Sequence, residues 1–77
     1  MPKRPSLSYR HVIKILKRHG FKLDRQDGSH QQWVAHTKGK PRVVTVIAFK
    51  KDYAHKTMKA MIQQSGLTED EWYDIFT

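Results

Sequence analysis

The spacing of apolar residues changes along the chain, and the first part has the spacing of a helix. Four apolar residues fall at i, i+3, i+4 and i+7, which places them on one side of an α-helix; they are Tyr9, Val12, Ile13 and Leu16. Ser8 is a suitable N-cap for this helix, and Gly20 is a suitable residue to end it. An amphipathic helix is therefore predicted between these two residues.

The middle of the chain has the pattern of three β-strands. Phe21–Gln26 alternates apolar and polar residues, Asp27-Gly28 is a turn-forming pair, and Ser29–Thr37 continues as a second strand, which predicts a hairpin. Thr37–Pro41 is the next turn. Arg42–Phe49 is a nearly unbroken β-branched run, which is typical of a strand at the centre of a sheet or covered on both faces.

Helical spacing returns in the last third of the chain. A second helix, closed by Gly66, is predicted from Ala54, Met58, Met61, Ile62 and Ser65. Thr68 and Glu71 have the form of a capping box, which opens a short C-terminal helix. The residues expected to pack from that last helix are Trp72, Ile75 and Phe76.

The predicted fold class is α+β, with the order α-β-β-β-α and a three-stranded antiparallel sheet that carries both main helices on one face. Seventy-seven residues are enough for one small domain, 1–77. Within it, residues 1–6 are expected to be a basic flexible tail and residues 68–77 to contain the short helix.

The hairpin register decides which way His30 faces. A two-residue Asp27-Gly28 loop would pair Arg25 with His30 and place both on the apolar side of the hairpin, near its rim. A one-residue bulge after the glycine would instead turn Trp33 inward and His30 outward. The first arrangement is the preferred one, and both leave His30 at the mouth of a tight turn.

The charge of the chain favours a polyanionic partner. Residues 1–60 carry all 15 Lys and Arg against three Asp, a net charge of +12 (15 minus 3), while residues 61–77 carry no base and four acids. The alternative is that these cations only keep a small protein in solution.

The chain has no cysteine, which excludes disulfides and cysteine-based zinc sites. It also has no apolar run that could span a membrane, so a cytoplasmic location is expected.

His30 is the first candidate for chemistry on such a partner. Cleavage of RNA without a metal needs a base for the 2′-hydroxyl, cations for the phosphoryl oxygens and an acid for the leaving oxygen. Histidine can accept and donate protons near neutral pH, and Arg25 or the lysines could hold the phosphate. From the residues alone, an ordinary surface histidine is the commoner case. No metal or other cofactor is indicated.

Two groups of basic residues are candidates for binding phosphates. The first helix carries a stripe on its polar side, Arg10, Lys14, Lys17 and Arg18. The second group flanks the start of the second helix and consists of Lys50, Lys51, Lys56 and Lys59. Trp33 could stack on an unpaired base, although a packing role is the alternative. The remaining histidines, His11, His19, His36 and His55, are expected to be structural or solvated.

Two stretches of the chain resemble the HicA-type toxins of bacterial and archaeal toxin-antitoxin pairs. The front half reads "LKRHGFKLDRQDGSHQQWV", and its matching residues are Gly20, Phe21, Arg25, Gly28, Ser29, His30 and Trp33. The back half reads "TMKAMIQQSGL", and its matching residues are Thr57, Met58, Met61, Ile62, Ser65 and Gly66. The similarity runs from about Ser8 to Leu67.

The resemblance implies a fold like that of double-stranded-RNA-binding domains and a metal-independent ribonuclease that cleaves mRNA. It also implies neutralisation by a HicB-type antitoxin. Carried over by residue, it makes His30 the catalytic histidine, with Gly28 and Ser29 shaping its turn.

The chain departs from the family at two places. Many members have Val-Pro-x-His at the third strand, where this chain reads Val46 to Phe49, "VIAF", and Lys56 replaces a glycine before the second helix. Without the second histidine, the proton donor would be Ser29, a lysine or water, or activity would be lost. Two further hypotheses therefore stay open, a non-catalytic RNA-binding module and a protein whose cationic face binds only another protein.

Overall fold

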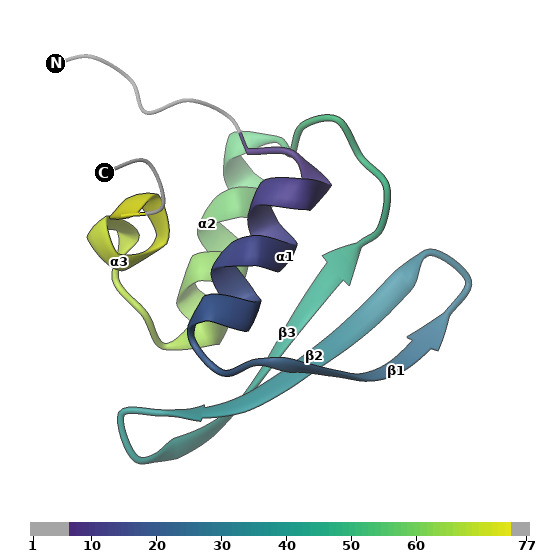
Figure 1. Ribbon diagram of the computed structural model, residues 1–77. Coiled ribbons are helices and arrows are strands. Elements are labelled where there is room, and N and C mark those ends of the chain that lie inside the picture. The colour runs from purple at the N-terminus through teal and green to yellow at the C-terminus, as the bar shows by residue number, and fades with distance from the viewer. Residues whose placement is uncertain (1–6, 75–77) are drawn as a thin grey trace, which may run out of the picture.

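The chain folds as the sequence predicts, with the order α-β-β-β-α followed by a short helix. In the computed structural model (Figure 1), which describes residues 7–74, the elements are α1 (Tyr9–Arg18), β1 (Lys22–Asp27), β2 (His30–Thr37), β3 (Lys40–Ile47), α2 (His55–Ser65) and α3 (Glu69–Tyr73). The strands form one antiparallel sheet in the order β1-β2-β3. The predicted α+β fold, like that of double-stranded-RNA-binding domains, is confirmed. No helix in residues 7–74 is long and apolar enough to cross a membrane.

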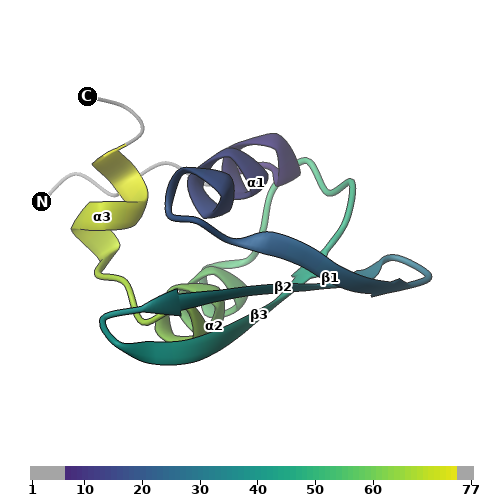
Figure 2. The same ribbon diagram turned by 60° about the horizontal axis from the view of Figure 1, so that its bottom comes forward.

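Both helices pack on one face of the sheet, which is called the inner face here. The buried core combines apolar residues of α1 and α2 with alternate residues of the strands, among them Val12, Ile15, Leu16, Met58, Met61, Trp33, Val44 and Val46. The opposite, outer face is left open, and the β1–β2 turn extends beyond the helices in both ribbon views (Figures 1 and 2). Residues near that turn are therefore accessible.

The first helix begins and ends where the sequence predicts. The Ser8 hydroxyl accepts a hydrogen bond from the backbone N–H of His11, and the His11 ring accepts one from the Ser8 backbone N–H at 3.3 Å. This pair is a capping box in which histidine takes the place usually held by Glu or Gln. Beyond the helix, Gly20 has a positive φ of 85°, which suits a residue that ends a helix.

The third strand is an edge strand, so the prediction of a central or doubly covered position is wrong. It ends at Ile47, and Ala48 and Phe49 form a turn. Val44 is buried on the inner face, while Val43 on the outer face is 53% exposed. The free edge of β3 contacts α2 rather than another strand. The Gln64 side-chain oxygen of α2 accepts a hydrogen bond from the backbone N–H of Thr45 at 3.1 Å.

The preferred register of the first hairpin is also wrong. The two loop residues are Gly28 and Ser29, and His30 pairs with Asp27 instead of Arg25. Gly28 has a φ of 61°, and glycine is favoured at the first loop position of a tight hairpin turn. Trp33 faces inward and His30 outward, as in the alternative arrangement, although the irregularity in the pairing lies in β1, between Leu23 and Arg25.

Ser65 joins the end of α2 to the rest of the fold. Its backbone oxygen accepts a hydrogen bond from the Thr37 hydroxyl at 2.7 Å, and its own hydroxyl accepts one from the indole N–H of Trp72 at 2.9 Å. Next to it, Gly66 has a φ of 73°, and a Cβ there would collide with the Arg42 side chain. The expected tail, residues 1–6, and the packing expected of Ile75 and Phe76 lie outside the described residues.

The predicted capping box of the last helix is present and includes an ion pair at the surface. The Glu71 carboxylate accepts hydrogen bonds from Lys38 Nζ at 2.9 Å and from the Thr68 backbone N–H at 2.8 Å. These contacts, first that with Lys38, lower the pKa of Glu71 from 4.5 to about 2. The ionised carboxylate is therefore the form that stabilises α3.

We expect Glu71→Gln to lower the melting temperature at neutral pH, because glutamine can keep the cap but loses the charge. A carboxylate with a depressed pKa stabilises the fold above its unfolded-state pKa and ceases to do so as the pH falls through the folded-state value. The difference between the two proteins should thus shrink as the pH falls from 4.5 towards 2. Thermal melts over this range test it, and a difference independent of pH would contradict it.

Candidate functional site

His30 is the first residue of β2 and lies on the outer face of the sheet. Its side chain is exposed, and its neighbours across the two ladders are Asp27 on β1 and Ile47 on β3. Directly opposed residues of an antiparallel pair have their Cβ atoms within about 4.5–5.5 Å of each other. An acidic and an apolar side chain therefore flank the imidazole, and its outer side is open to solvent.

A chain of side-chain hydrogen bonds fixes the strand around His30. Gln31 is buried, and its amide nitrogen donates to Gln26 Oε1 at 3.1 Å, while the Gln26 amide donates to the Gly28 carbonyl at 2.9 Å. On its other side, Gln31 Oε1 accepts from Trp33 Nε1 at 2.9 Å and from the Tyr9 hydroxyl at 3.1 Å. The turn before His30 is thus connected to the core and to α1.

A second contact holds the other residue of the turn. The backbone N–H of Ala48 donates to the Ser29 carbonyl at 2.7 Å, which joins the β1–β2 turn to the segment after β3. The Ser29 side chain itself is exposed. Because both turn carbonyls are bound, the backbone that carries His30 is held in place while its ring stays accessible, which is the arrangement that a reactive group needs.

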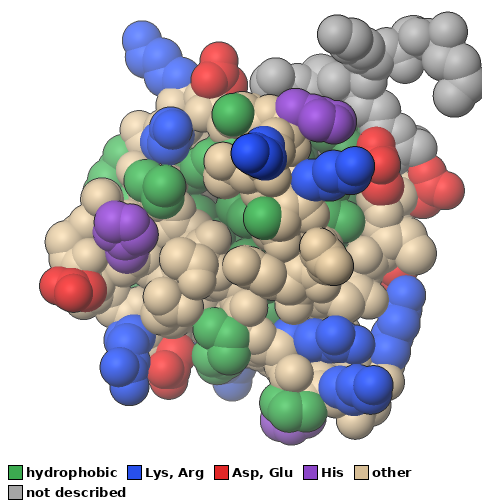
Figure 3. Space-filling view, turned by 180° about the vertical axis from the view of Figure 1, so that it is seen from behind, with side chains coloured by type: hydrophobic (Ala, Val, Ile, Leu, Met, Phe, Trp, Pro, Cys, Tyr) green, Lys and Arg blue, Asp and Glu red, His purple; other side chains and the backbone are tan. Residues whose placement is uncertain are grey.

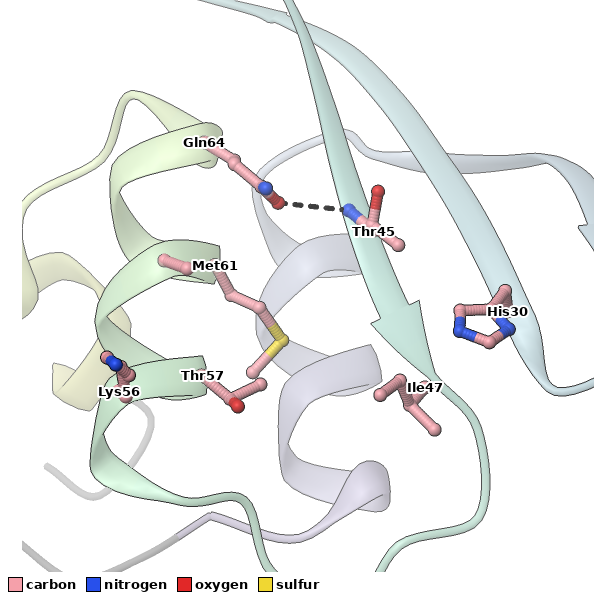
Figure 4. A pocket seen from close by; sticks show the side chains of 8 residues that line it. His30, Thr45, Ile47, Lys56, Thr57, Met61 and Gln64 are labelled. Carbon is pink, nitrogen blue, oxygen red and sulfur yellow. Dashed lines mark hydrogen bonds between the residues drawn. The ribbon is translucent and has the colours of Figure 1, made fainter.

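A pocket of about 400 Å³ opens beside His30, between β3 and α2. Its lining consists of His30, Thr45, Ile47, Lys56, Thr57, Ala60, Met61 and Gln64. In Figure 4, His30 and Lys56 lie on opposite sides of the pocket, with Ile47 and Thr57 between them. His30, Lys56 and Thr57 therefore border one space, whereas the Thr45 hydroxyl donates to Gln32 Oε1 at 3.0 Å.

Among the basic residues near α2, Lys56 is the one that the structure places at the pocket beside His30. Lys56 lines the pocket, and Lys59 follows it by three residues, which places the two on adjacent turns of the same helix side. Lys50 and Lys51 are exposed in the segment before α2. Figure 3, which views the molecule from behind Figure 1, shows Lys and Arg side chains above and below a mostly uncharged middle zone.

The basic stripe of α1 is not brought to His30. Its residues are Arg10, Lys14, Lys17 and Arg18, all of them exposed. Because the buried side of α1 packs on the inner face, the stripe faces away from the sheet, and His30 lies on the outer face.

Arg25 pairs with Gln32, its side chain is 78% exposed, and its Nε lies 3.8 Å from an Asp24 oxygen. It is therefore diagonal to His30 and not directly opposite it.

Trp33 cannot serve as a stacking surface, which corrects its place among the candidate RNA-binding residues. Only 4% of its surface is exposed, and its indole N–H is bound to Gln31. The packing alternative is the one that the structure supports.

Sequence reasoning also missed Asp27, the cross-strand neighbour of His30, because the predicted register placed it in the loop. Within residues 7–74, no group of three His, Asp or Glu side chains is placed to hold a metal ion.

Comparison with known families decides the identity of the chain. A family model described as the HicA toxin of bacterial toxin-antitoxin matches residues 9–67. The chain belongs to the HicA toxin family. No curated protein matches the sequence.

The family match confirms the resemblance to HicA-type toxins and indicates the general class of function. A HicA-family chain is a toxin of a toxin-antitoxin pair, and toxins of this family generally cleave mRNA. The match covers α1, the whole sheet and α2, so it includes the pocket and the turn that carries His30.

We expect His30→Ala to keep the fold, because the histidine side chain is exposed and removal of such a group changes stability by about 0.5 kcal/mol or less. Circular dichroism and a thermal melt against the unsubstituted protein test this. A large loss of stability would show that His30 has a structural role, and any loss of function in the variant could then not be assigned to chemistry.

Proposed function

We propose that this protein is a metal-independent endoribonuclease of a toxin-antitoxin pair, that mRNA is its substrate and that His30 transfers the proton. The observation that carries the proposal is an exposed imidazole directly after a rigid turn, bordering the same pocket as Lys56. The family match supports the reaction class. The assignment of roles to individual side chains rests on the geometry of the pocket.

The residues support cleavage by attack of the 2′-hydroxyl on the neighbouring phosphorus. His30 takes the proton of that hydroxyl, and the new P–O bond forms as the bond to the 5′-oxygen breaks, which leaves a cyclic 2′,3′-phosphate and a 5′-hydroxyl. Lys56 supplies positive charge to the phosphoryl oxygens, where negative charge accumulates. The proton for the leaving oxygen comes from Ser29, from a lysine or from water, since the chain lacks the histidine that many members carry on β3.

Binding of RNA is assigned to exposed cations on two sides of the molecule. We propose that Lys50, Lys51, Lys56 and Lys59 hold phosphates close to the reacting bond. Arg25, diagonal to His30 on the neighbouring strand, contributes from beside the site, and the α1 stripe contributes at a greater distance, through the long-range field. Such contacts position RNA without reading its sequence.

A HicB-type antitoxin is the proposed protein partner. Residues 1–60 carry a net charge of +12 (15 minus 3), so an acidic surface that covers the pocket would be attracted to it and would exclude RNA. A cytoplasmic location, where mRNA is available, remains the expectation for such a pair.

We expect His30→Ala to abolish RNA cleavage in EDTA while RNA affinity stays close to that of the unsubstituted protein. The matched control is His36→Ala, because His36 is an exposed histidine on the same strand and the same face, remote from the pocket. Loss of activity in the first variant alone supports the proposal; equal activity in both would contradict it. The measurement is the initial rate on a labelled transcript, with gel analysis of the product ends.

The second candidate function is RNA binding without cleavage. It is favoured by one observation, the absence of the second histidine, whose position is held by Phe49. The same assay separates the two functions, since salt-dependent RNA binding with no cleavage by the unsubstituted protein would establish the binding module.

We expect Lys56→Gln to weaken RNA binding at low salt and to reduce the slope of log affinity against log salt concentration by about 1, the effect of one lost phosphate contact. Lys40→Gln is the control, because Lys40 is exposed at the far end of β3 and pairs with Thr37. A filter-binding titration over several salt concentrations gives both slopes. Equal slopes for the two variants would place Lys56 outside the phosphate contacts.

A further inference from the structure

Phe49 is an exposed aromatic residue in a strained backbone conformation. Its relative exposure is 79%, compared with 53% for Val43 and 45% for Leu23. Its φ is 63°, in the left-handed region, which costs a residue with a side chain about 1–2 kcal/mol relative to an ordinary conformation. Burial does not offset this cost, because most of the ring is in water. Lys38 has a similar φ of 53° in the β2–β3 turn, so it is the combination of strain with an exposed aromatic ring that points to a binding role.

The segment around Phe49 is held rigidly in spite of the strain. The carbonyl of Lys50 accepts a hydrogen bond from the backbone N–H of Tyr9 at 2.9 Å, and the Tyr53 hydroxyl donates to the Ile47 carbonyl. Burial, and then the nearby Tyr9, raise the pKa of Tyr53 to about 12, so this donor keeps its proton at all ordinary pH values. The Phe49 ring contacts the Tyr9 ring with centroids 5.1 Å apart.

Phe49 also lies next to the proposed cleavage site. Its neighbour Ala48 is hydrogen-bonded to the Ser29 carbonyl, and Ile47, two residues before it, is paired with His30. Lys50 and Lys51 follow directly in the sequence. The backbone of Phe49 thus lies between the segment bound to the β1–β2 turn and a pair of exposed cations, while its ring packs against Tyr9 of α1.

We propose that Phe49 is a stacking platform for an unpaired base of the RNA, adjacent to the phosphate at His30. The proposal rests on the proposed ribonuclease function and specifies its substrate as RNA that is single-stranded at the cut. Every base has a flat face that can stack on an aromatic ring, whereas the bases of a duplex already stack on their neighbours. Exposed aromatic residues also occur in protein interfaces, so the choice of RNA rests on Lys50 and Lys51, because lysine is depleted in interface cores and binds backbone phosphates.

Binding is best measured in the His30→Ala background, so that the RNA is not consumed. Phe49→Leu keeps an apolar side chain without the aromatic face, and we expect it to weaken binding of a single-stranded oligonucleotide by roughly 5- to 140-fold, the equivalent of about 1–3 kcal/mol per stacked base. Affinity for a blunt duplex of the same sequence should stay unchanged. An abasic oligonucleotide should bind equally to the Phe49→Leu variant and to its parent.

Two further variants separate stacking from folding. Phe49→Gly removes the ring and relieves the positive φ, so its melting temperature should be preserved while single-strand affinity falls. Phe49→Trp should keep the affinity and report binding directly, because Trp33 and Trp72 are buried and the new indole would be quenched by a stacked base. Val43→Ala, on the outer face of β3, is the control for an exposed apolar residue remote from the turn.

The proposal is overturned if Phe49→Leu and Phe49→Gly bind single-stranded RNA as tightly as the parent, or lose duplex affinity to the same extent. It is also overturned if these variants keep RNA affinity but bind the antitoxin more weakly, which would make Phe49 a protein anchor. Failure of the ribonuclease proposal gives a different result. In that case the unsubstituted protein does not cleave RNA, but substitution of Phe49 still weakens binding of single-stranded RNA.

Discussion

The structure depends on one buried polar side chain, the amide of Gln31. Its nitrogen and oxygen together join the turn before His30, the core indole of Trp33 and the hydroxyl of Tyr9 on α1. A buried amide without partners would be costly, but this one is bonded on both of its polar atoms. The same contacts that make its burial tolerable fix the position of the turn. Stability of the core and placement of the candidate catalytic group are therefore connected through a single residue.

The elements were predictable because local signals agreed with the final packing. Helix ends are marked by the Ser8 and Thr68 capping boxes and by Gly66 with its positive φ. Each of these signals involves only residues close together in the sequence. The position of β3 at an edge was not predictable. A β-branched run indicates a strand with at least one buried face, but it does not show which strands pair with it or what covers its other face. The hairpin register failed for a related reason. Asp27-Gly28 and Gly28-Ser29 are both acceptable loops, and the choice between them is made by burial of Gln31 and Trp33 on the inner face.

The candidate site was predictable only in part. His30 could be chosen from its turn and from the resemblance, and Lys56 from charge alone. Their common pocket depends on how α2 meets the edge of β3, through Gln64 and Thr45, which are far apart in the sequence. Phe49 attracted attention only as a departure from the family pattern, because exposure and backbone strain cannot be seen in a sequence. Sequence alone also does not separate the basic residues, of which Lys56 lines the pocket while the α1 stripe lies on another side of the molecule.

The exposed first strand has a consequence for the behaviour of the free protein. Every residue of β1 is exposed, and the strand has an unpaired outer edge, which is the kind of surface on which other chains add strands and start aggregates. Its charged residues are Lys22, Asp24, Arg25 and Asp27, and its pairing is interrupted between Leu23 and Arg25. Alternating signs and an irregular edge both discourage intermolecular strand pairing. The free edge of β1 is therefore a poor template for the addition of strands from other copies of the chain.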